Sequence, residues 1–268
     1  METNELERRR WNDAYFTSLW TKRERLTDGV TSYLLDALAL QSGERVLDVG
    51  PGGGRQSLAA ARAVGPGGSV VGADVSEPLS RLAQRRAEEE GVENVEFRVL
   101  DVQTHAVDGA PFDVAMSQFG VMFFDEPVTA FSNIRGQLEP GGRLVFACWQ
   151  SVERNPWFFA AVNEFVPRPP EPAPGKSPTG PFALADPDRT AGILEQAGFG
   201  GVARTDHSLD VDVPEDSVFE EGQLEFLGVA EDDLPAARVA LEAHLAQFRL
   251  PPGLVRLPLR FQIFRAAR

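Results

Sequence analysis

The 268-residue sequence lacks several features that mark other classes of protein. Its one cysteine, Cys148, cannot form an internal disulfide, and three histidines leave little for a structural zinc site, so we expect no metal. No apolar run approaches the roughly 20 residues that a membrane helix needs. The first ten residues show no apolar signal core, and we therefore expect a cytoplasmic protein without a membrane anchor.

Positive charge is also scarce. The 26 Lys and Arg residues face 40 Asp and Glu residues, which gives a net charge of -14. Binding to a nucleic-acid backbone depends on clustered Lys and Arg, so nucleic acid is not expected as the main partner. The hydrophobic fraction of 43% and the charged fraction of 25% are ordinary for a soluble globular protein. We expect a monomer or homodimer that handles a small molecule.

The most informative stretch begins at Glu44 and reads ERVLDVGPGGGR. Residues 45–49 form a short apolar run that predicts a buried strand, and residues 55–64 predict an Ala-rich helix. The glycines between them allow a ligand to lie against the backbone, and the helix start offers unpaired N–H groups. A strand, a glycine turn and a helix in this order indicate a nucleotide site at the edge of a parallel sheet.

Strands and helices alternate after this turn. The pattern predicts strands over residues 69–74, 95–101, 112–117 and 143–149, with helices over 77–90 and 127–138 and a turn over 139–142. Such alternation is typical of a parallel sheet, whose right-handed crossovers place all strand C-terminal ends on one edge. This topology predicts that the ends of four strands meet there, bringing together Asp48, Asp74, Asp101 and Ser117.

The flanking segments are less regular. Residues 4–25 predict an amphipathic helix that packs on the domain, covers the ligand site as a lid, or does both. We expect residues 1–43 to form a helical cap and residues 44–268 the main domain, with insertions near 150–185 and 214–250. Further elements are predicted as helices over 30–40, 186–197, 215–229 and 232–248, and as strands over 202–213 and 254–265.

The glycine turn partly fits two cofactor patterns. A dinucleotide fold has Gly-x-Gly-x-x-Gly, but Ser57 stands where the third glycine would be. Asp74 could bind a ribose in this pattern too, so an NAD-dependent oxidoreductase remains an alternative. The acid Asp48 inside the first strand and the Gly50-x-Gly52-x-Gly54 spacing fit a different pattern better.

Five segments in register carry that second pattern, namely VLDVGPGGG, VVGADVS, FRVLDVQ, FDVAMSQFGVMFF and LEPGGRLVFACW. With them the sequence resembles the class I S-adenosylmethionine-dependent methyltransferases, and within these the bacterial branch similar to ubiquinone/menaquinone-biosynthesis methyltransferases. The resemblance implies a Rossmann-like, doubly wound α/β fold with a seven-stranded, mostly parallel sheet whose last strand is antiparallel. It also implies N-terminal helices, a helical or irregular lid, and S-adenosyl-L-methionine as cofactor.

The resemblance further implies a set of cofactor contacts. The methionine part would lie against Asp48 and the glycine turn, and the ribose against Asp74. The adenine would lie near Leu79 and Asp101, and the sulfonium beside the end of the fourth strand. The implied residues are Asp48, Gly50, Gly52, Gly54, Asp74, Val75, Leu79, Asp101, Val102, Ser117, Gln118 and Phe119. The residues alone leave open that Asp48 fixes the loop through backbone N–H groups, that Asp74 caps a helix and that Asp101 caps a turn.

The acceptor side is less defined. Methyl transfer needs mainly alignment, but an acidic hydroxyl or an enolisable carbon also needs a base. Candidates are His207, Tyr15 and Gln118, whereas His105 and His244 are interpreted as surface residues. A family member without catalytic activity remains an alternative. We expect an apolar pocket suited to a hydrophobic or aromatic small molecule, built from aromatics that include Trp157, Phe158, Phe159, Phe219, Phe226 and Phe248.

Overall fold

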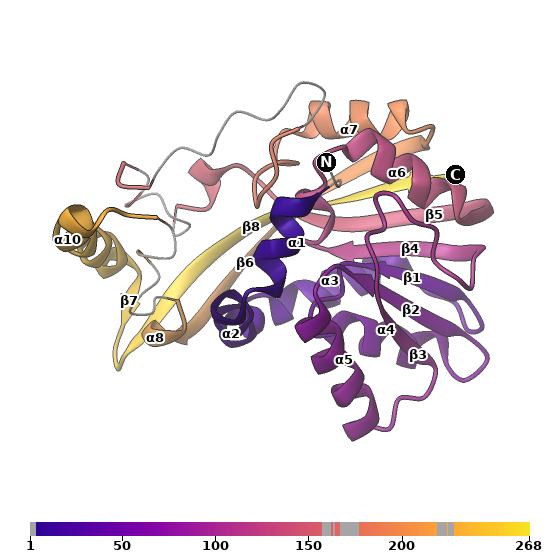
Figure 1. Cartoon of the computed structure of the whole chain (residues 1–268), viewed down its shortest axis with the longest axis horizontal. Coiled ribbons are helices and arrows are strands. Elements are labelled where there is room, and N and C mark those ends of the chain that lie inside the picture. Colours follow the sequence, from indigo (N-terminus) through magenta and orange to yellow (C-terminus); the bar gives the residue numbers. More distant parts are fainter. Residues whose placement is uncertain (1–3, 157–161, 163, 167–176, 219–223, 225–227) are drawn as a thin grey trace.

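A computed structural model describes residues 4–156, 162, 164–166, 177–218, 224 and 228–268. Its centre is one mixed sheet (Figure 1). In chain order its strands are β1 (Arg45–Val49), β2 (Ser69–Asp74), β3 (Val95–Val99), β4 (Phe112–Gln118), β5 (Leu138–Trp149), β6 (Gly200–Pro214), β7 (Arg249–Leu250) and β8 (Leu254–Ala267).

The strand order in space is β3-β2-β1-β4-β5-β8-β6. Neighbours from β3 to β5 are parallel, whereas β8 inserts between β5 and β6 and is antiparallel to both. This topology confirms the predicted Rossmann-like α/β fold with an antiparallel last strand. The two-residue β7, which pairs with β8, is an eighth strand that the sequence did not predict.

Helices cover both faces of the sheet. α3, α4 and α5 pack on one face, and α6 and α7 lie together on the other, as right-handed crossovers on either side of β1 require (Figure 1). The helices of the described residues are α1 (Glu5–Asn12), α2 (Ala14–Arg23), α3 (Asp28–Leu38), α4 (Arg55–Val64), α5 (Glu77–Glu89), α6 (Pro127–Gly136), α7 (Pro187–Gln196), α8 (Glu215–Val218) and α10 (Leu234–Leu245).

Three predicted boundaries are wrong. The single helix over 4–25 is broken at Asp13, whose carboxylate accepts a bond from Phe16 N–H at 2.9 Å and starts α2. The turn predicted over 139–142 lies inside β5, because a register shift lets the strand begin at Leu138, opposite Phe112. The third strand ends at Val99, so Asp101 lies just beyond it.

The main core lies between the sheet and its helices. Strands β1 and β4 and the second half of β5 are almost fully buried, which explains their continuous apolar runs. A small second cluster surrounds the inner side of α10, at Ala237, Leu241 and Leu245. Among the described residues no helix combines the length and the apolar character needed to cross a bilayer.

Candidate functional site

The strand order reverses between β1 and β4, where the chain has wound outward in one direction and then continues in the other. Such a switch point leaves a crevice at the carboxyl ends of the strands. Here the two strand ends nearly touch, because a Cβ on Gly50 would lie 2.9 Å from Gly120 Cα. A Cβ on Gly120 would lie 2.6 Å from the Val49 carbonyl oxygen. Glycine is therefore required on both sides of the crevice.

The glycine turn follows β1 directly and has positive φ at Gly52 (53°) and Gly54 (81°). A Cβ on Gly52 would lie 2.5 Å from the Trp20 indole, and one on Gly54 would lie 2.7 Å from Ala83 Cβ. The sequence interpretation attributed these glycines to ligand approach alone. In the structure, side chains of the chain itself already lie against the turn, so they require glycine there as well.

Asp48 is fully buried behind the turn. Ser57 Oγ, on α4, donates to its Oδ2 at 2.5 Å, and among the described atoms its Oδ1 has no hydrogen-bond partner. Burial raises the pKa of this carboxyl to about 7, although the Ser57 bond acts in the opposite direction. The described bonds of Asp48 therefore go to a side chain of α4 rather than to the backbone N–H groups of the loop.

Asp74 ends β2 and faces the same turn. Its Oδ2 accepts from Gly52 N–H at 2.9 Å and its Oδ1 from Ser76 N–H at 2.8 Å. Ser76 is the N-cap of α5, accepting from Leu79 N–H, so Asp74 is not the helix cap. Burial raises the pKa of Asp74. Each carboxylate oxygen has a further lone pair, so the side chain can hold the turn and still accept bonds from hydroxyl groups.

Asp101 follows β3 on the same rim. Its Oδ1 accepts from Gln103 N–H at 2.9 Å, which forms an Asx-type turn, and burial raises its pKa. Gln103 in turn donates to Asp125 Oδ1 at 2.7 Å, joining this loop to the loop after β4. The Gln103–Asp125 bond could not be predicted from the sequence, because the partners are 22 positions apart. Val102 and Leu79 are buried beside this rim.

The end of β4 is fixed by Ser117 and Gln118. Ser117 Oγ donates to the Val49 carbonyl at 2.7 Å and accepts from Gly120 N–H at 3.1 Å. Gln118 Oε1 accepts from Thr31 Oγ1 on α3 at 2.9 Å. Both side chains therefore brace the crevice, and Gln118 is oriented by α3.

The three candidate bases do not meet in one place. Tyr15 lies partly buried in α2, and Gln118 is bonded to α3. His207 lies in β6, three strands from β4, with its ring stacked on Phe261 at 5.3 Å between centroids. Burial lowers the pKa of His207. The structure thus separates His207 from the crevice that Gln118 borders.

The other two histidines are also away from the crevice. His105 is exposed and its Nδ1 bonds Thr104 Oγ1. His244 is on α10, and its Nε2 lies 2.6 Å from the Pro156 carbonyl oxygen. Of the aromatics expected in the acceptor pocket, Phe248 is described and partly buried. The remaining five, Trp157, Phe158, Phe159, Phe219 and Phe226, lie outside the described residues.

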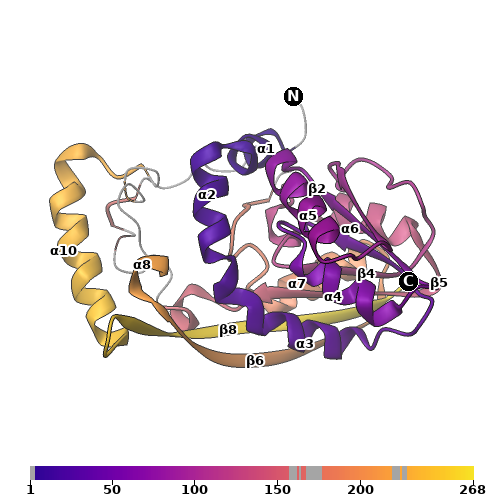
Figure 2. The ribbon, with the colours of Figure 1, turned by 90° about the horizontal axis from the view of Figure 1, so that it is seen from below.

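The N-terminal helices lie along the rim of the site (Figure 2). Asn12 Nδ2 donates to the Val75 carbonyl at 2.9 Å, and Asn12 Oδ1 accepts from Glu77 N–H at 3.0 Å. Ser76 Oγ donates to the Trp11 carbonyl at 2.6 Å. We call residues 4–28 the strap, since they extend from this loop to the glycine turn.

A forked ion pair fastens the strap to the glycine turn. Arg86 on α5 donates to both carboxylate oxygens of Glu24, at 2.6 and 2.8 Å, and to the Gly53 carbonyl at 2.8 Å. Arg55 adds a longer contact to Glu24 at 3.3 Å. The sequence did not predict this pair, because Glu24 and Arg86 are 62 positions apart and each could equally have been a solvated surface charge.

Removal of the Glu24 charge is expected to loosen the strap. The Glu24 and Arg86 side chains are only 7% and 16% exposed. Glu24→Gln therefore leaves the largely buried Arg86 without the carboxylate that it pairs with. We expect faster amide hydrogen exchange in α2 and a loss of stability of about 1–3 kcal/mol. Glu77→Gln is the matched control, because its pair with Arg81 is exposed and worth little. Equal exchange in α2 for both variants would show that the pair does not hold the strap.

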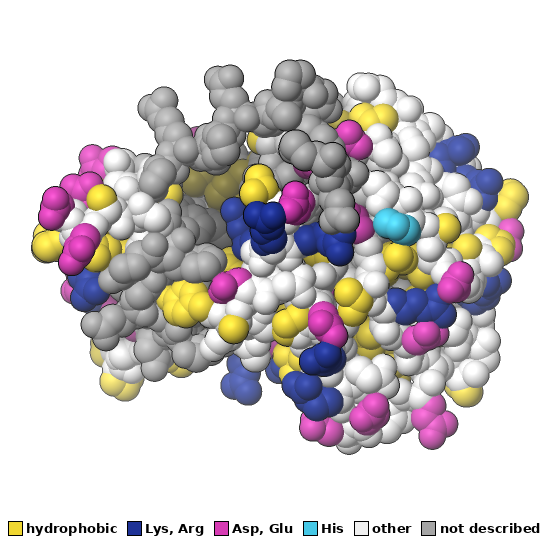
Figure 3. All heavy atoms as spheres, in the orientation of Figure 1, with side chains coloured by type: hydrophobic (Ala, Val, Ile, Leu, Met, Phe, Trp, Pro, Cys, Tyr) yellow, Lys and Arg dark blue, Asp and Glu magenta, His cyan; other side chains and the backbone are white. Residues whose placement is uncertain are grey.

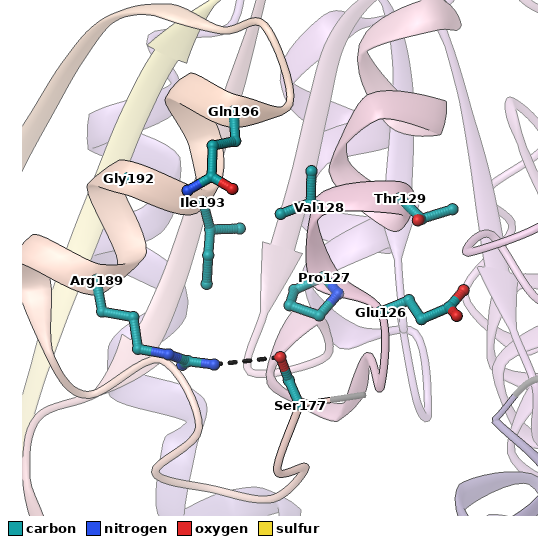
Figure 4. A pocket seen from close by; sticks show the side chains of 9 residues that line it. All are labelled: Glu126, Pro127, Val128, Thr129, Ser177, Arg189, Gly192, Ile193 and Gln196. Carbon is teal, nitrogen blue, oxygen red and sulfur yellow. Dashed lines mark hydrogen bonds between the residues drawn. The ribbon is translucent and has the colours of Figure 1, made fainter. Parts of the chain in front are cut away.

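A separate cavity of about 440 Å³ opens between α6 and α7 (Figure 4). In it Arg189 donates to Ser177 Oγ at 3.3 Å. None of the predicted site residues lines this cavity, so it is distinct from the crevice. Its lining residues are Glu126, Pro127, Val128, Thr129, Ser177, Arg189, Gly192, Ile193 and Gln196.

Two further features of the described part of the surface are its charge pattern and its metal-ligating side chains. On the face shown in Figure 3, basic and acidic side chains are interspersed, so neither sign dominates it. Among the described residues no three His, Cys, Asp or Glu side chains are grouped so that they could hold a metal ion.

Comparisons with known proteins show similarity to methyltransferases over about half of the chain. Residues 40–170 match the model of a methyltransferase domain. The chain is 33% identical over 134 residues to aklanonic acid methyltransferase of Streptomyces sp. strain C5, covering 50% of this chain and 58% of that protein. It is 31% identical over 170 residues to the ubiquinone biosynthesis O-methyltransferase of Ruegeria sp. strain TM1040, covering 61% and 63%. The matches thus span less than two thirds of each relative.

The fold has solved counterparts. Phosphoethanolamine N-methyltransferase 2 of Haemonchus contortus, solved in complex with S-adenosyl-L-methionine, aligns with a TM-score of 0.60. The identity is 15%, and the alignment covers 97% of this chain and 59% of that one. At this identity the likeness concerns the fold alone.

The matched half of the chain is similar to methyltransferases, which supports the class I S-adenosylmethionine-dependent family that its five motifs predicted. The cofactor that the motifs imply is S-adenosyl-L-methionine. The residues at the crevice fit this group, since Asp48 Oδ1 is a buried carboxylate oxygen without a described partner and Asp74 has accepting capacity left over. The sulfonium cofactor carries positive charge, which suits a rim with three carboxylates.

Proposed function

We propose that this protein transfers a methyl group from S-adenosyl-L-methionine to a small hydrophobic or aromatic acceptor. The observation that carries the proposal is the position of Asp48, Asp74 and Asp101, each buried and each at or just beyond the carboxyl end of its strand, on the rim that includes the switch point. Three buried carboxylates next to a glycine turn match a ligand with a cationic head, a ribose and an adenine. The aromatic residues expected around the acceptor support an apolar substrate.

The chain's own residues supply binding and alignment. Asp74 would accept from the ribose hydroxyls with the lone pairs that Gly52 and Ser76 leave open. Asp101 and the Val102 backbone would hold the adenine edge, and Gly50 to Gly54 would lie along the methionine part. The bound cofactor supplies an electrophilic methyl group on sulfur. Held in line with it, an acceptor would react mainly through proximity, so the reaction does not require the three candidate bases to meet in one place.

The domain assignment is part of the proposal. Residues 1–43 would act as a helical cap, and the strap contacts at Val75, Ser76 and Glu24 support this role. The segments near 150–185 and 214–250 would form the acceptor pocket, with Phe248 at its described border. Capping the crevice would exclude water from the transfer step.

A product screen tests the transfer directly. We expect that incubation with S-adenosyl-L-methionine and a panel of quinol-like, polyketide-like and phenolic compounds yields a product heavier by one CH₂ group, detected by mass spectrometry. S-adenosylhomocysteine should form in equal amount. Methylation of small polar acceptors only would contradict the hydrophobic acceptor. Tight cofactor binding with no product from any acceptor would instead favour a family member that has lost catalysis.

A further inference from the structure

Phe119 has an unusual backbone conformation directly after β4. Its φ is +64°, in the left-handed region that bulky residues rarely adopt. This conformation costs a non-glycine residue free energy, so the surrounding structure must impose it. Phe119 N–H donates to the Ala147 carbonyl at 3.0 Å, and the neighbouring Gly120 N–H is held by Ser117 Oγ. The turn is thus fixed from both sides.

A glycine at position 119 would adopt this conformation without strain, so the presence of Phe calls for a role of its side chain. The ring lies flat on Trp149, with 4.1 Å between centroids and 8° between planes. Trp149 ends β5, the strand next to β4. The strained turn therefore presents an aromatic ring at the rim, one residue away from the Gly50–Gly120 contact.

Phe119 is the least buried ring in a row that also includes Trp149 and Phe261. Trp149 pairs in register with Phe261 on β8, and Phe261 pairs with His207 on β6, so these side chains share one face of the sheet. Tyr33 on α3 packs against both Phe261 and His207. Trp149 and Phe261 are buried, whereas Phe119 is only half-buried. Of Phe119, Trp149 and Phe261, Phe119 therefore has the most surface left for a ligand.

We propose that Phe119 is a specificity-determining residue whose ring forms a platform on which a planar aromatic acceptor stacks beside the cofactor turn. The inference rests on the proposed function and narrows its acceptor to flat aromatic rings. Stacked aromatic rings contribute binding free energy in addition to that of the apolar area they bury. A saturated ring with the same number of carbon atoms does not make this additional contribution. The cofactor would supply the methyl group, and the stacking on Phe119 would hold the acceptor ring beside it.

The platform is tested by binding in the complex with S-adenosylhomocysteine. We measure naphthol and its fully hydrogenated analogue by titration calorimetry. The wild-type protein should prefer naphthol, and Phe119→Leu should weaken naphthol binding roughly three- to tenfold with little change for the saturated analogue. Phe119→Tyr keeps a ring and should keep the preference. Phe123→Leu, which removes a rim ring packed on Trp11 instead of Trp149, is the matched control and should also keep it.

The outcomes separate the two hypotheses. Equal binding of the two probes by the wild-type protein, or an equal loss for both in Phe119→Leu, would overturn the platform. Cooperative thermal unfolding close to that of the wild type verifies the fold of each variant, and Phe119→Met replaces Phe119→Leu if the latter does not fold. A wild-type protein that selects naphthol but methylates no acceptor would contradict the proposed function and leave the platform standing.

Discussion

Replacement of Asp74 by Ala is expected to weaken S-adenosylhomocysteine binding at least tenfold, about 1.4 kcal/mol or more. The reason is the loss of charge-assisted bonds to the ribose, together with the loss of the carboxylate that holds Gly52 N–H in the turn. Titration calorimetry measures the affinity, and thermal unfolding measures the accompanying loss of stability.

Asp186→Ala provides a matched control for that variant. Asp186 also accepts two backbone N–H bonds, from Asp188 and Arg189, but it caps α7 away from the crevice. We expect it to lose about 1 kcal/mol of stability with unchanged cofactor affinity. An Asp74→Ala protein that binds S-adenosylhomocysteine as tightly as the wild type would remove Asp74 from the cofactor site.

Asp48 is expected to make the stability of the cofactor-free protein fall as the pH rises. Its carboxyl has an ordinary pKa of 3.8 when unfolded but about 7 when buried, so between these values the folded protein holds the extra proton. The stabilisation is complete below pH 3.8 and is lost by about pH 7. Over this window the loss is on the order of 4 kcal/mol.

Denaturant unfolding of the wild type and Asp48→Asn at pH 5 and pH 8 measures this effect. Asn has no titrating proton, so the fall in stability between the two pH values should be smaller in the variant by a few kcal/mol. Asp74 and Asp101 have pKa values raised in the same direction, but they are present in both proteins and cancel in the comparison. An equal fall in both proteins would show that Asp48 is already ionised in the fold.

Ligand binding provides a second test of the ionisation of the Asp48 carboxyl. If its unpartnered Oδ1 lies near the cationic amino group of S-adenosylhomocysteine, the ligand favours the ionised carboxylate. The ligand should then stabilise the wild-type protein more at pH 8 than at pH 6, and this difference should vanish in Asp48→Asn.

The central sheet could be predicted well because each strand is indicated by a short apolar run in the sequence. The apolar runs of β1, β2 and β4 are buried strands, and their short spacing from the helices allows only a parallel arrangement. The acids Asp48 and Asp74 could be placed at the rim for the same reason, since a strand end fixes where its last side chain lies.

The contacts that close the site could not be predicted. Trp20 reaches Gly52, and Glu24 reaches Arg86, only because the strap folds back over a turn distant in sequence. Helical spacing in residues 4–25 indicated an apolar face but not the break at Asp13 or what the face covers. The stacking of Phe119 on Trp149 likewise depends on a left-handed residue that no propensity favours.

The measurement that tests the central claim most directly is a calorimetric comparison of S-adenosylhomocysteine with NADH on the wild-type protein. We predict that S-adenosylhomocysteine binds at one site per chain and that NADH does not compete. Tight binding of NADH, with no heat from S-adenosylhomocysteine, would contradict the assignment of Asp48, Asp74 and the glycine turn to a methyl donor.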